Sequence, residues 1–386
     1  MSEEKLVPKL RFSGFDDEWN EDYLNKLFDN RNERNFESLE VLSVTINDGV
    51  LKRSDLGSDR KNKDKKSMKH VLKGDLVYNP MFMWKGASGI SSYEGITSAD
   101  YIVLKSKNNV NPIFFSHLFQ TEKSLNKFKN YSQGSLLERL RLMYPQFSDI
   151  KMAFPSYEEQ EKIANLLTFV DNKIELIEKK YQTYLDFKKY LMQQIFTQKL
   201  RFNFNDAWKT VKIKDIFDER SEKGFLDLEL LSVTLNDGVI KRSEIESKDN
   251  SNENKSNYKH VLPGDIVYNS MRMWQGASGV SPYEGIVSPA YTILIPKNVY
   301  SKYFGYYFKT NEMVYQFKKY SQGLTSDTWN LKYPLISEIK IKIPSIEEQK
   351  EITNVFEIMD EKIKILQNNI DELTTFKKGL LQQMFV

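Results

Sequence analysis

The sequence predicts an α+β fold: two similar mixed α/β domains separated by two long helices that form an antiparallel coiled coil with pseudo-two-fold internal symmetry. Two observations support this prediction. Nearly the whole chain of 386 residues is a tandem repeat, and each copy ends in a long stretch with apolar residues at heptad spacing. The predicted globular domains are residues 1–154 and 200–343, and the predicted helical regions are residues 155–199 and 344–386.

The repeat is clearest in "GDLVYNPMFMWKGASGISSYEGITS" (74–98), which recurs as "GDIVYNSMRMWQGASGVSPYEGIVS" (264–288). Further pairs are "LSVTINDGVLKRS" with "LSVTLNDGVIKRS", "PSYEEQEKI" with "PSIEEQKEI", and "YSQG" with itself. The offset between copies is 189 or 190 residues throughout, far longer than the roughly 20–50 residues of a solenoid repeat. Each copy is therefore the size of a domain.

Short apolar segments in the globular part of each copy are predicted strands because they are rich in β-branched and aromatic residues. They are "DLVYN" (75–79), "YIVLK" (101–105), "DIVYN" (265–269) and "YTILI" (291–295). "NDGV" in both copies predicts a turn, with Gly49 and Gly238 at positive φ.

The pattern becomes helical after Pro155 and Pro344, where Ser156 with Glu159 and Ser345 with Glu348 predict capping boxes. A helix of about 40 residues extends about 60 Å, and an exposed apolar seam of that length needs a partner. The nearest partner is the corresponding helix of the other copy. The alternative is that each helix packs on its own domain. The predicted seam comprises Ile163, Leu167, Val170, Ile174 and Ile177 in the first helix, and Ile352, Phe356, Met359, Ile363, Leu366, Ile370 and Leu373 in the second.

Composition excludes several kinds of site. The chain has no cysteine and only three histidines, so disulfides, thiolate metal sites and His-rich metal sites are not expected. We expect a cytoplasmic protein without a membrane span, because there is no long apolar run and "MSEEKLVPKL" lacks the core of a signal peptide. The net charge of +3 points to no particular partner, although residues 52–73 hold nine Lys and Arg against three Asp.

Two motifs imitate catalysis, and we reject both. "NPMF" (79–82) resembles the Asn-Pro-Pro-Tyr/Phe loop of amino-methyltransferases, but Met81 replaces the second proline and the other copy has "NSMR". No Gly-rich loop after a strand offers a site for S-adenosylmethionine. "EQK" (348–350) imitates part of a nuclease motif but lies in a predicted helix. We therefore predict no catalytic residues and no enzymatic activity in this chain.

The tandem layout resembles the specificity subunit of type I restriction–modification enzymes. The motifs that carry the resemblance are "PKLRF..F...W" (8–19), the "GD.VYN" strand, and "P...EQ..I" at the start of each long helix. The resemblance implies that each globular region is a target recognition domain for half of a split double-stranded DNA sequence. It implies that the long helices form a spacer and dock two methyltransferase subunits, through which restriction–translocase subunits join. S-adenosylmethionine and ATP with Mg²⁺ are then expected on those partners and no cofactor on this chain.

Recognition of DNA bases requires hydrogen-bond donors and acceptors on loops that reach into a groove of the duplex. The candidates in the first copy are Asn79, Trp84, Lys85, Ser88, Tyr131, Ser132 and Gln133, and in the second copy Asn269, Arg272, Trp274, Gln275, Ser278, Tyr320, Ser321 and Gln322. Candidates for phosphate contacts are Lys52, Arg53, Lys69, Lys241, Arg242 and Lys259. The alternative is that the aromatic residues belong to the core and that "YSQG" is a loop without DNA contact.

Because the two domains are close copies, we predict a split, partly palindromic target with related, inverted half-sites. Differences such as Phe82 against Arg272 and Lys85 against Gln275 would make the halves unequal. Two other interpretations stay open. One is a self-sufficient adenine methyltransferase, which needs a cofactor loop. The other is a structural coiled-coil adaptor that binds protein rather than DNA.

Overall fold

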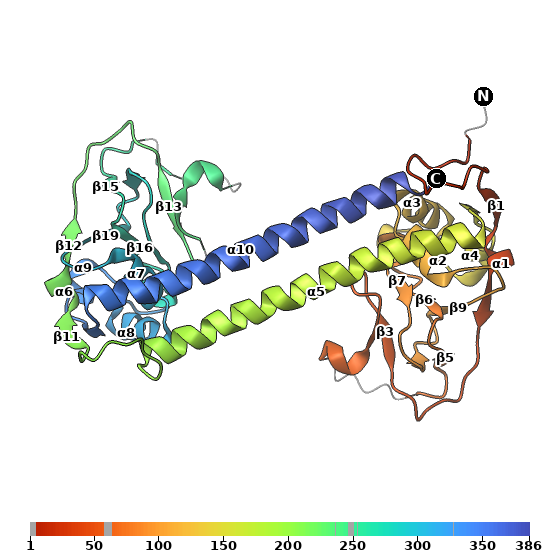
Figure 1. The fold of residues 1–386 in the computed structure, drawn as a ribbon, viewed down its shortest axis with the longest axis horizontal. Coiled ribbons are helices and arrows are strands. Elements are labelled where there is room, and N and C mark those ends of the chain that lie inside the picture. Colours follow the sequence, from red (N-terminus) through yellow and green to blue (C-terminus); the bar gives the residue numbers. More distant parts are fainter. Residues whose placement is uncertain (1–4, 58–63, 236, 246–250, 253, 327) are drawn as a thin grey trace. The chain divides into compact units, whose positions relative to one another are not determined.

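A computed structural model describes residues 5–57, 64–235, 237–245, 251–252, 254–326 and 328–386. The chain divides into two compact units (Figure 1). Unit 1 is Met1–Glu178 with Asn368–Val386, and unit 2 is Lys179–Gln367. Each unit therefore contains a globular domain, the first part of one long helix and the last part of the other.

The two globular domains have the same order of elements, as the repeat predicts, except that the described part of unit 2 shows no counterpart of η3. Unit 1 contains β1 (Asn20–Tyr23), α1 (Leu24–Leu27), β2 (Phe28–Arg31), β3 (Leu42–Val44), β4 (Val50–Lys52), η1 (Arg53–Leu56), β5 (Lys69–Val71), β6 (Leu76–Tyr78), η2 (Met83–Lys85), β7 (Ser88–Ile90), β8 (Gly95–Thr97), β9 (Ile102–Ser106), α2 (Pro112–Leu118), α3 (Glu122–Tyr131), η3 (Leu137–Arg139), α4 (Tyr144–Ser148) and β10 (Lys151–Phe154). Unit 2 contains β11 (Lys209–Lys212), α6 (Ile213–Ile216), β12 (Phe217–Arg220), β13 (Leu231–Thr234), β14 (Gly238–Lys241), η4 (Arg242–Glu244), β15 (Lys259–Val261), β16 (Ile266–Asn269), η5 (Met273–Gln275), β17 (Ser278–Val280), β18 (Gly285–Val287), β19 (Tyr291–Pro296), α7 (Ser301–Tyr307), α8 (Asn311–Tyr320), α9 (Tyr333–Ile336) and β20 (Lys340–Ile343).

Each domain is built on a four-stranded antiparallel sheet, in the order β2-β9-β6-β7 in unit 1 and β12-β19-β16-β17 in unit 2. The predicted strands are the central pair of each sheet: Val77 lies opposite Val103, and Val267 lies opposite Ile293. Their side chains are buried on both faces, which explains the nearly continuous apolar sequence. The predicted fold class, with two similar mixed α/β domains and long helices, is confirmed.

The predicted "NDGV" turn is confirmed in the first copy, and in the second copy Asn236 lies outside the described residues. The glycine of this motif explains a second glycine in each copy. Gly49 has φ 63° and Gly238 has φ 68°, a conformation that favours glycine. A Cβ atom on Gly89 would lie 2.8 Å from the Cα of Gly49, and one on Gly279 would lie 2.7 Å from the Cα of Gly238. The β3–β4 and β13–β14 hairpins therefore approach the sheet at backbone contact, and both "ASG" motifs are needed for packing.

The long helices are α5 (Tyr157–Phe196) and α10 (Ile346–Gln383), each unbroken in Figure 1. Half of each predicted capping box is present, because Ser156 Oγ accepts the Glu159 N–H at 3.4 Å. The Glu159 carboxylate does not close the box; it accepts two 2.8 Å hydrogen bonds from Arg11. Arg201 binds Glu348 in the same way in unit 2, at 3.0 and 2.7 Å. The repeated "LRF" motif thus anchors each domain to the start of its long helix.

The two long helices run antiparallel where they meet within each unit. In unit 1, Lys377 of α10 pairs with Asp171 of α5 at 2.5 Å, and the end of α10 packs into the core near the start of α5. In unit 2, Lys188 pairs with Asp360, and Phe196 stacks on Phe356 with ring centroids 5.8 Å apart. Lys188 and Lys377, at equivalent positions of the two helices, therefore make ion pairs between the helices.

The predicted seam residues serve two purposes. Seven are buried: Ile163, Leu167, Val170, Ile352, Phe356, Met359 and Leu366. The others, Ile174, Ile177, Ile363, Ile370 and Leu373, are half-buried. The first three seam positions of each helix belong to the core of that helix's own domain, together with the end of the other helix. Each long helix therefore packs on its own globular domain and also pairs with the other long helix.

His117 of α2 faces the helix pair of unit 1. Its Nε2 lies 4.0 Å from Asp171, beside Lys377. Burial lowers the pKa of His117 to about 4; Asp171 opposes this shift and Lys377 adds to it. The counterpart in unit 2 is Tyr306, whose hydroxyl donates to Asp360 at 2.8 Å. Each domain is thus connected to an aspartate that also joins the two helices.

Acid should weaken unit 1 through His117. Because its folded pKa lies below the ordinary 6.5, the unfolded chain binds more protons between these values. Its contribution is complete above pH 6.5 and is lost as the pH falls toward 4, by up to roughly 3 kcal/mol. Urea unfolding of the wild type and of His117→Tyr from pH 4 to 8 checks this. The difference between their unfolding free energies should change across the window; a constant difference contradicts the assignment.

Among the residues that the structure describes, no helix combines the length and the hydropathy of a membrane span.

Candidate nucleic-acid interface

The loop after β6 carries several candidate side chains of unit 1 on a rigid backbone. Asn79 Oδ1 accepts the Met81 N–H at 3.1 Å, which closes the turn into η2. Trp84 donates from Nε1 to the Met81 carbonyl at 3.1 Å, so the indole is fixed on its own loop. Gly86, with φ 92°, ends η2. Trp84 is half-buried and Lys85 is exposed.

Unit 2 repeats this loop nearly bond for bond. Asn269 Oδ1 accepts from the Met271 N–H at 3.0 Å, and Trp274 Nε1 donates to the Met271 carbonyl at 3.1 Å. Gly276, with φ 87°, ends η5. Arg272 is exposed, as is Gln275 at the position of Lys85. The two loops therefore present corresponding side chains from the same scaffold.

The structure brings the "YSQG" candidates to the side of the loop. Helix α3 packs against η2, and α8 packs against η5. Beyond α3, Gln133 and Arg141 exchange backbone hydrogen bonds of 3.0 and 2.9 Å, and the Leu142 N–H donates to the Pro80 carbonyl at 3.0 Å. Tyr131 and Gln133 are exposed and Ser132 is half-buried. In unit 2, Gln322 is exposed and Tyr320 and Ser321 are half-buried.

Cations and aromatic rings alternate on this surface, and the sequence candidates missed part of it. The ammonium groups of Lys85 and Lys129 lie 4.9 and 5.8 Å from the Trp84 ring. In unit 2, Trp329 meets Trp274 edge to face at 5.3 Å, and Lys318 lies 5.5 Å from the Trp329 ring. The sequence candidates did not include Lys129 and Lys318. Their place two residues before the "YSQG" motifs was the sign that could have identified them. Basic side chains interleaved with aromatic rings are typical of nucleic-acid surfaces.

Three predicted contact residues do not fit that role, because their side chains are buried. Ser88 Oγ accepts from Gln120 at 3.1 Å, and Ser278 Oγ donates to the Gly276 carbonyl at 3.3 Å. Lys69 is buried and donates to the Tyr101 carbonyl at 2.6 Å, and burial lowers its pKa. These side chains hold the scaffold.

The other predicted phosphate contacts are half-buried and already engaged. Lys52 pairs with Glu40 at 3.3 Å, and Arg53 donates to Ser43 at 3.2 Å. In unit 2, Lys241 lies 5.3 Å from the Tyr283 ring. Lys259 Nζ donates to the Tyr291 carbonyl at 2.8 Å, as Lys69 does to Tyr101.

A depression of about 510 Å³ in unit 2 is lined by one residue predicted to contact DNA phosphate and by one predicted to contact a base. Arg242 from η4 and Asn269 from β16 both line it, with Asn252, Tyr258 and Tyr291. The structure therefore places two predicted contact residues from distant segments around one polar hollow.

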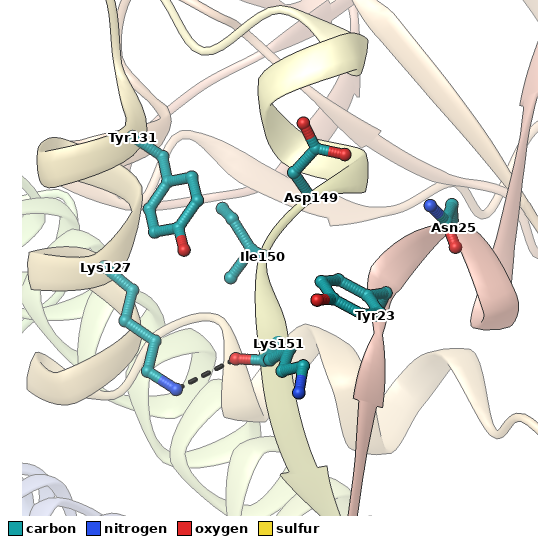
Figure 2. A pocket seen from close by; sticks show the side chains of 7 residues that line it. All are labelled: Tyr23, Asn25, Lys127, Tyr131, Asp149, Ile150 and Lys151. Carbon is teal, nitrogen blue, oxygen red and sulfur yellow. Dashed lines mark hydrogen bonds between the residues drawn. The ribbon is translucent and has the colours of Figure 1, made fainter.

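Tyr131 lines a pocket of about 550 Å³ in unit 1 (Figure 2). Figure 2 shows Tyr131 from α3 and Tyr23 from β1 on opposite sides of Ile150. Lys127 donates to the Lys151 carbonyl at 2.9 Å, and the Lys151 ammonium lies 5.0 Å from the Tyr23 ring. This pocket extends the basic and aromatic surface of unit 1 beyond the loop.

The equivalent place in unit 2 holds an ion-pair cluster. Lys212 and Lys214 each donate to Glu338 at 2.6 Å, and their hydrogen bonds lower the pKa of Glu338 to about 2. Tyr320, the counterpart of Tyr131, packs against the core. The two units thus share the loop surface but differ beside it.

Within the described residues there is no group of three or more His, Asp or Glu side chains placed to hold a metal ion. The recurring chemistry of the candidate site is exposed cations, amides and aromatic rings on two matching scaffolds. These groups can recognise an anionic, base-bearing ligand by hydrogen bonding, stacking and charge.

Comparisons with known proteins agree with this chemistry. The family model of the type I restriction modification DNA specificity domain matches residues 81–183 and 205–375. The type I restriction enzyme MjaVIII specificity subunit of Methanocaldococcus jannaschii is 24% identical over 337 residues, which cover 78% of this chain and 76% of that protein. The putative MjaX specificity subunit of the same organism is 22% identical over 364 residues, covering 87% and 84%.

A solved structure shows the same fold. The S subunit of a type I restriction–modification system from M. genitalium aligns with a TM-score of 0.61 at 14% identity, over 98% of this chain and 99% of that one. The family model covers well over half of the chain, including the second part of the first globular domain and nearly all of the second domain. The resemblance drawn from the sequence motifs is thereby confirmed, and the chain belongs to the family of type I restriction–modification DNA specificity subunits.

Proposed function

We propose that this chain selects the DNA target of a type I restriction–modification enzyme by binding a bipartite sequence, one half-site per unit, without performing the chemistry. The observation that carries the proposal is the duplicated loop. Asn79 with Trp84, and Asn269 with Trp274, are fixed by the same hydrogen bonds in both units. Two equal scaffolds that present amides and cations suit two related half-sites.

The proposed half-sites are inverted relative to each other. Each unit contains the first part of one long helix and the last part of the other, and the helices run antiparallel in each unit. This exchange of equivalent segments supports the proposal that corresponding side chains of the two units recognise bases on opposite DNA strands.

The proposed partners are two methyltransferase subunits docked on the long helices, with restriction–translocase subunits joined through them. Exposed apolar side chains recur at equivalent places: Phe169 and Leu176 of α5 in unit 1, and Ile358 and Ile365 of α10 in unit 2. A separation of seven residues places each pair on one helix face, where another helix can pack. S-adenosylmethionine and ATP with Mg²⁺ belong to those partners in this proposal, which is set in the cytoplasm.

Methyl transfer with separated components tests the proposal. The full chain and a methyltransferase subunit from the same operon are incubated with labelled S-adenosylmethionine and duplex DNA, together and separately. We expect transfer only when both are present, and a salt-dependent shift of duplex DNA by the complex. Transfer by this chain alone would instead make it a self-sufficient methyltransferase. A complex that forms without shifting DNA would make it a structural adaptor.

A further inference from the structure

Positions 82 and 272 are equivalent in the two units but carry different side chains. Phe82 has φ −126° and ψ 11°, and Arg272 has φ −124° and ψ 3°. The Phe82 N–H donates to the Asn79 carbonyl at 3.0 Å, and the Arg272 N–H donates to the Asn269 carbonyl at 2.9 Å. The backbone is thus the same, and the two side chains leave corresponding points of the two loops.

The surroundings of these positions are also alike. The Phe82 carbonyl accepts from the Lys85 N–H at 2.9 Å, and the Arg272 carbonyl accepts from the Gln275 N–H at 2.9 Å. The tryptophan two residues further on is fixed identically in each unit. The loops differ at two exposed positions, 82/272 and 85/275, and at one buried position, where Pro80 is replaced by Ser270.

Both side chains are exposed without a strong intramolecular partner. Phe82 is 38% exposed, and its ring lies 5.7 Å from the Lys85 ammonium. No residue that the structure describes gives the Arg272 guanidinium a hydrogen bond or an ion pair. An exposed guanidinium keeps all its donors available for a ligand, and an exposed phenyl ring offers only apolar contact.

These two chemistries match different base edges in the major groove. A guanidinium forms two hydrogen bonds with O6 and N7 of guanine, whereas an apolar side chain contacts the C5-methyl group of thymine. We propose that positions 82 and 272 determine one corresponding base in each half-site: Arg272 selects guanine and Phe82 selects thymine. The side chains that the two loops share are then expected to select the same bases in both halves. This inference rests on the proposed function.

Methylome mapping of swapped variants tests the inference. The full chain is expressed with its methyltransferase subunit, and modified motifs are mapped for the wild type, Phe82→Arg, Arg272→Phe and the double swap. We expect the wild-type halves to differ by thymine against guanine at one corresponding position. Phe82→Arg should replace thymine with guanine in one half only, with a preference on the order of ten- to a hundred-fold. Arg272→Phe should do the converse in the other half, and the double swap should exchange the two.

A control substitution and the substitution Phe82→Ala make each outcome interpretable. Lys105→Gln, which changes an exposed lysine of β9 outside the loop, should leave that base unchanged. If Phe82→Arg abolishes methylation, Phe82→Ala should still relax selection at that position alone. Unchanged motifs in the variants overturn the inference, as does a uniform loss for Arg272→Phe, which marks a phosphate contact. Failure of the proposed function is separate, because the wild type would then give no two-block motif at all.

Discussion

Replacing Phe356 with alanine is expected to lower the free energy of unfolding of unit 2 by about 3–5 kcal/mol. Phe356 is fully buried in α10, stacked on Phe196 of α5 at 5.8 Å and packed on Tyr306 of α7 at 5.1 Å. Its removal leaves a cavity where the globular domain and both long helices meet. The surrounding aromatic rings cannot collapse into that cavity without breaking their own packing.

Urea denaturation, with hydrogen exchange to locate the loss, measures this effect. Ile358→Ala is the matched control, because Ile358 lies two residues away on the same helix and is 58% exposed. The control should change the unfolding free energy by less than about 0.5 kcal/mol. Amides of unit 2 should lose protection in Phe356→Ala, and the domain of unit 1 should keep its protection. Equal effects of the two substitutions would show that Phe356 is not a core residue.

Replacing Phe169 and Leu176 together with aspartate is expected to prevent binding of one of the two methyltransferase subunits proposed to dock on the long helices. These side chains are 65% and 67% exposed, so the substitution leaves the core of unit 1 intact. A methyltransferase subunit that buries both side chains would lose this apolar contact. It would instead have to bury two carboxylates without water. Loss of binding should therefore be complete at micromolar concentrations.

The binding stoichiometry from size-exclusion chromatography with light scattering checks this expectation. The wild type should bind two methyltransferase subunits, the Phe169/Leu176 variant one, and a variant that also changes Ile358 and Ile365 to aspartate none. Lys173→Asp with Lys180→Asp is the control, because it adds negative charge to α5 at two exposed polar positions. Two subunits still bound to the Phe169/Leu176 variant would place the docking surface elsewhere.

The repeat made most of the fold predictable. Central strands such as residues 75–79 combine an apolar pattern with turn residues that recur in the second copy, and local pattern is sufficient to predict them. The pairing of Arg11 with Glu159 was not predictable in this way, because the partners are 148 residues apart. The joint recurrence of "LRF" and "EEQ" was the only sign that both motifs belong to one structural joint.

The exposure of the candidate contact residues was only partly predictable from the sequence. Motif conservation between the copies identified the loop that contains Trp84, but it does not distinguish exposed residues from buried ones. Ser88 and Lys69 recur in unit 2 because they hold the scaffold. In the proposed recognition, the side chains that differ, such as Phe82, determine specificity; the repeat aligns them with their counterparts, and the common backbone conformation supports that alignment.

Single-molecule sequencing of DNA from cells that express this chain with its methyltransferase subunit is the most direct test of paired, equivalent DNA-recognition units. The expected result is methylated adenine in a motif of two short blocks separated by a gap of constant length. The second block, taken on the opposite strand, should share most of its bases with the first. A single contiguous motif, or two blocks with unrelated bases, would contradict recognition by two equivalent units.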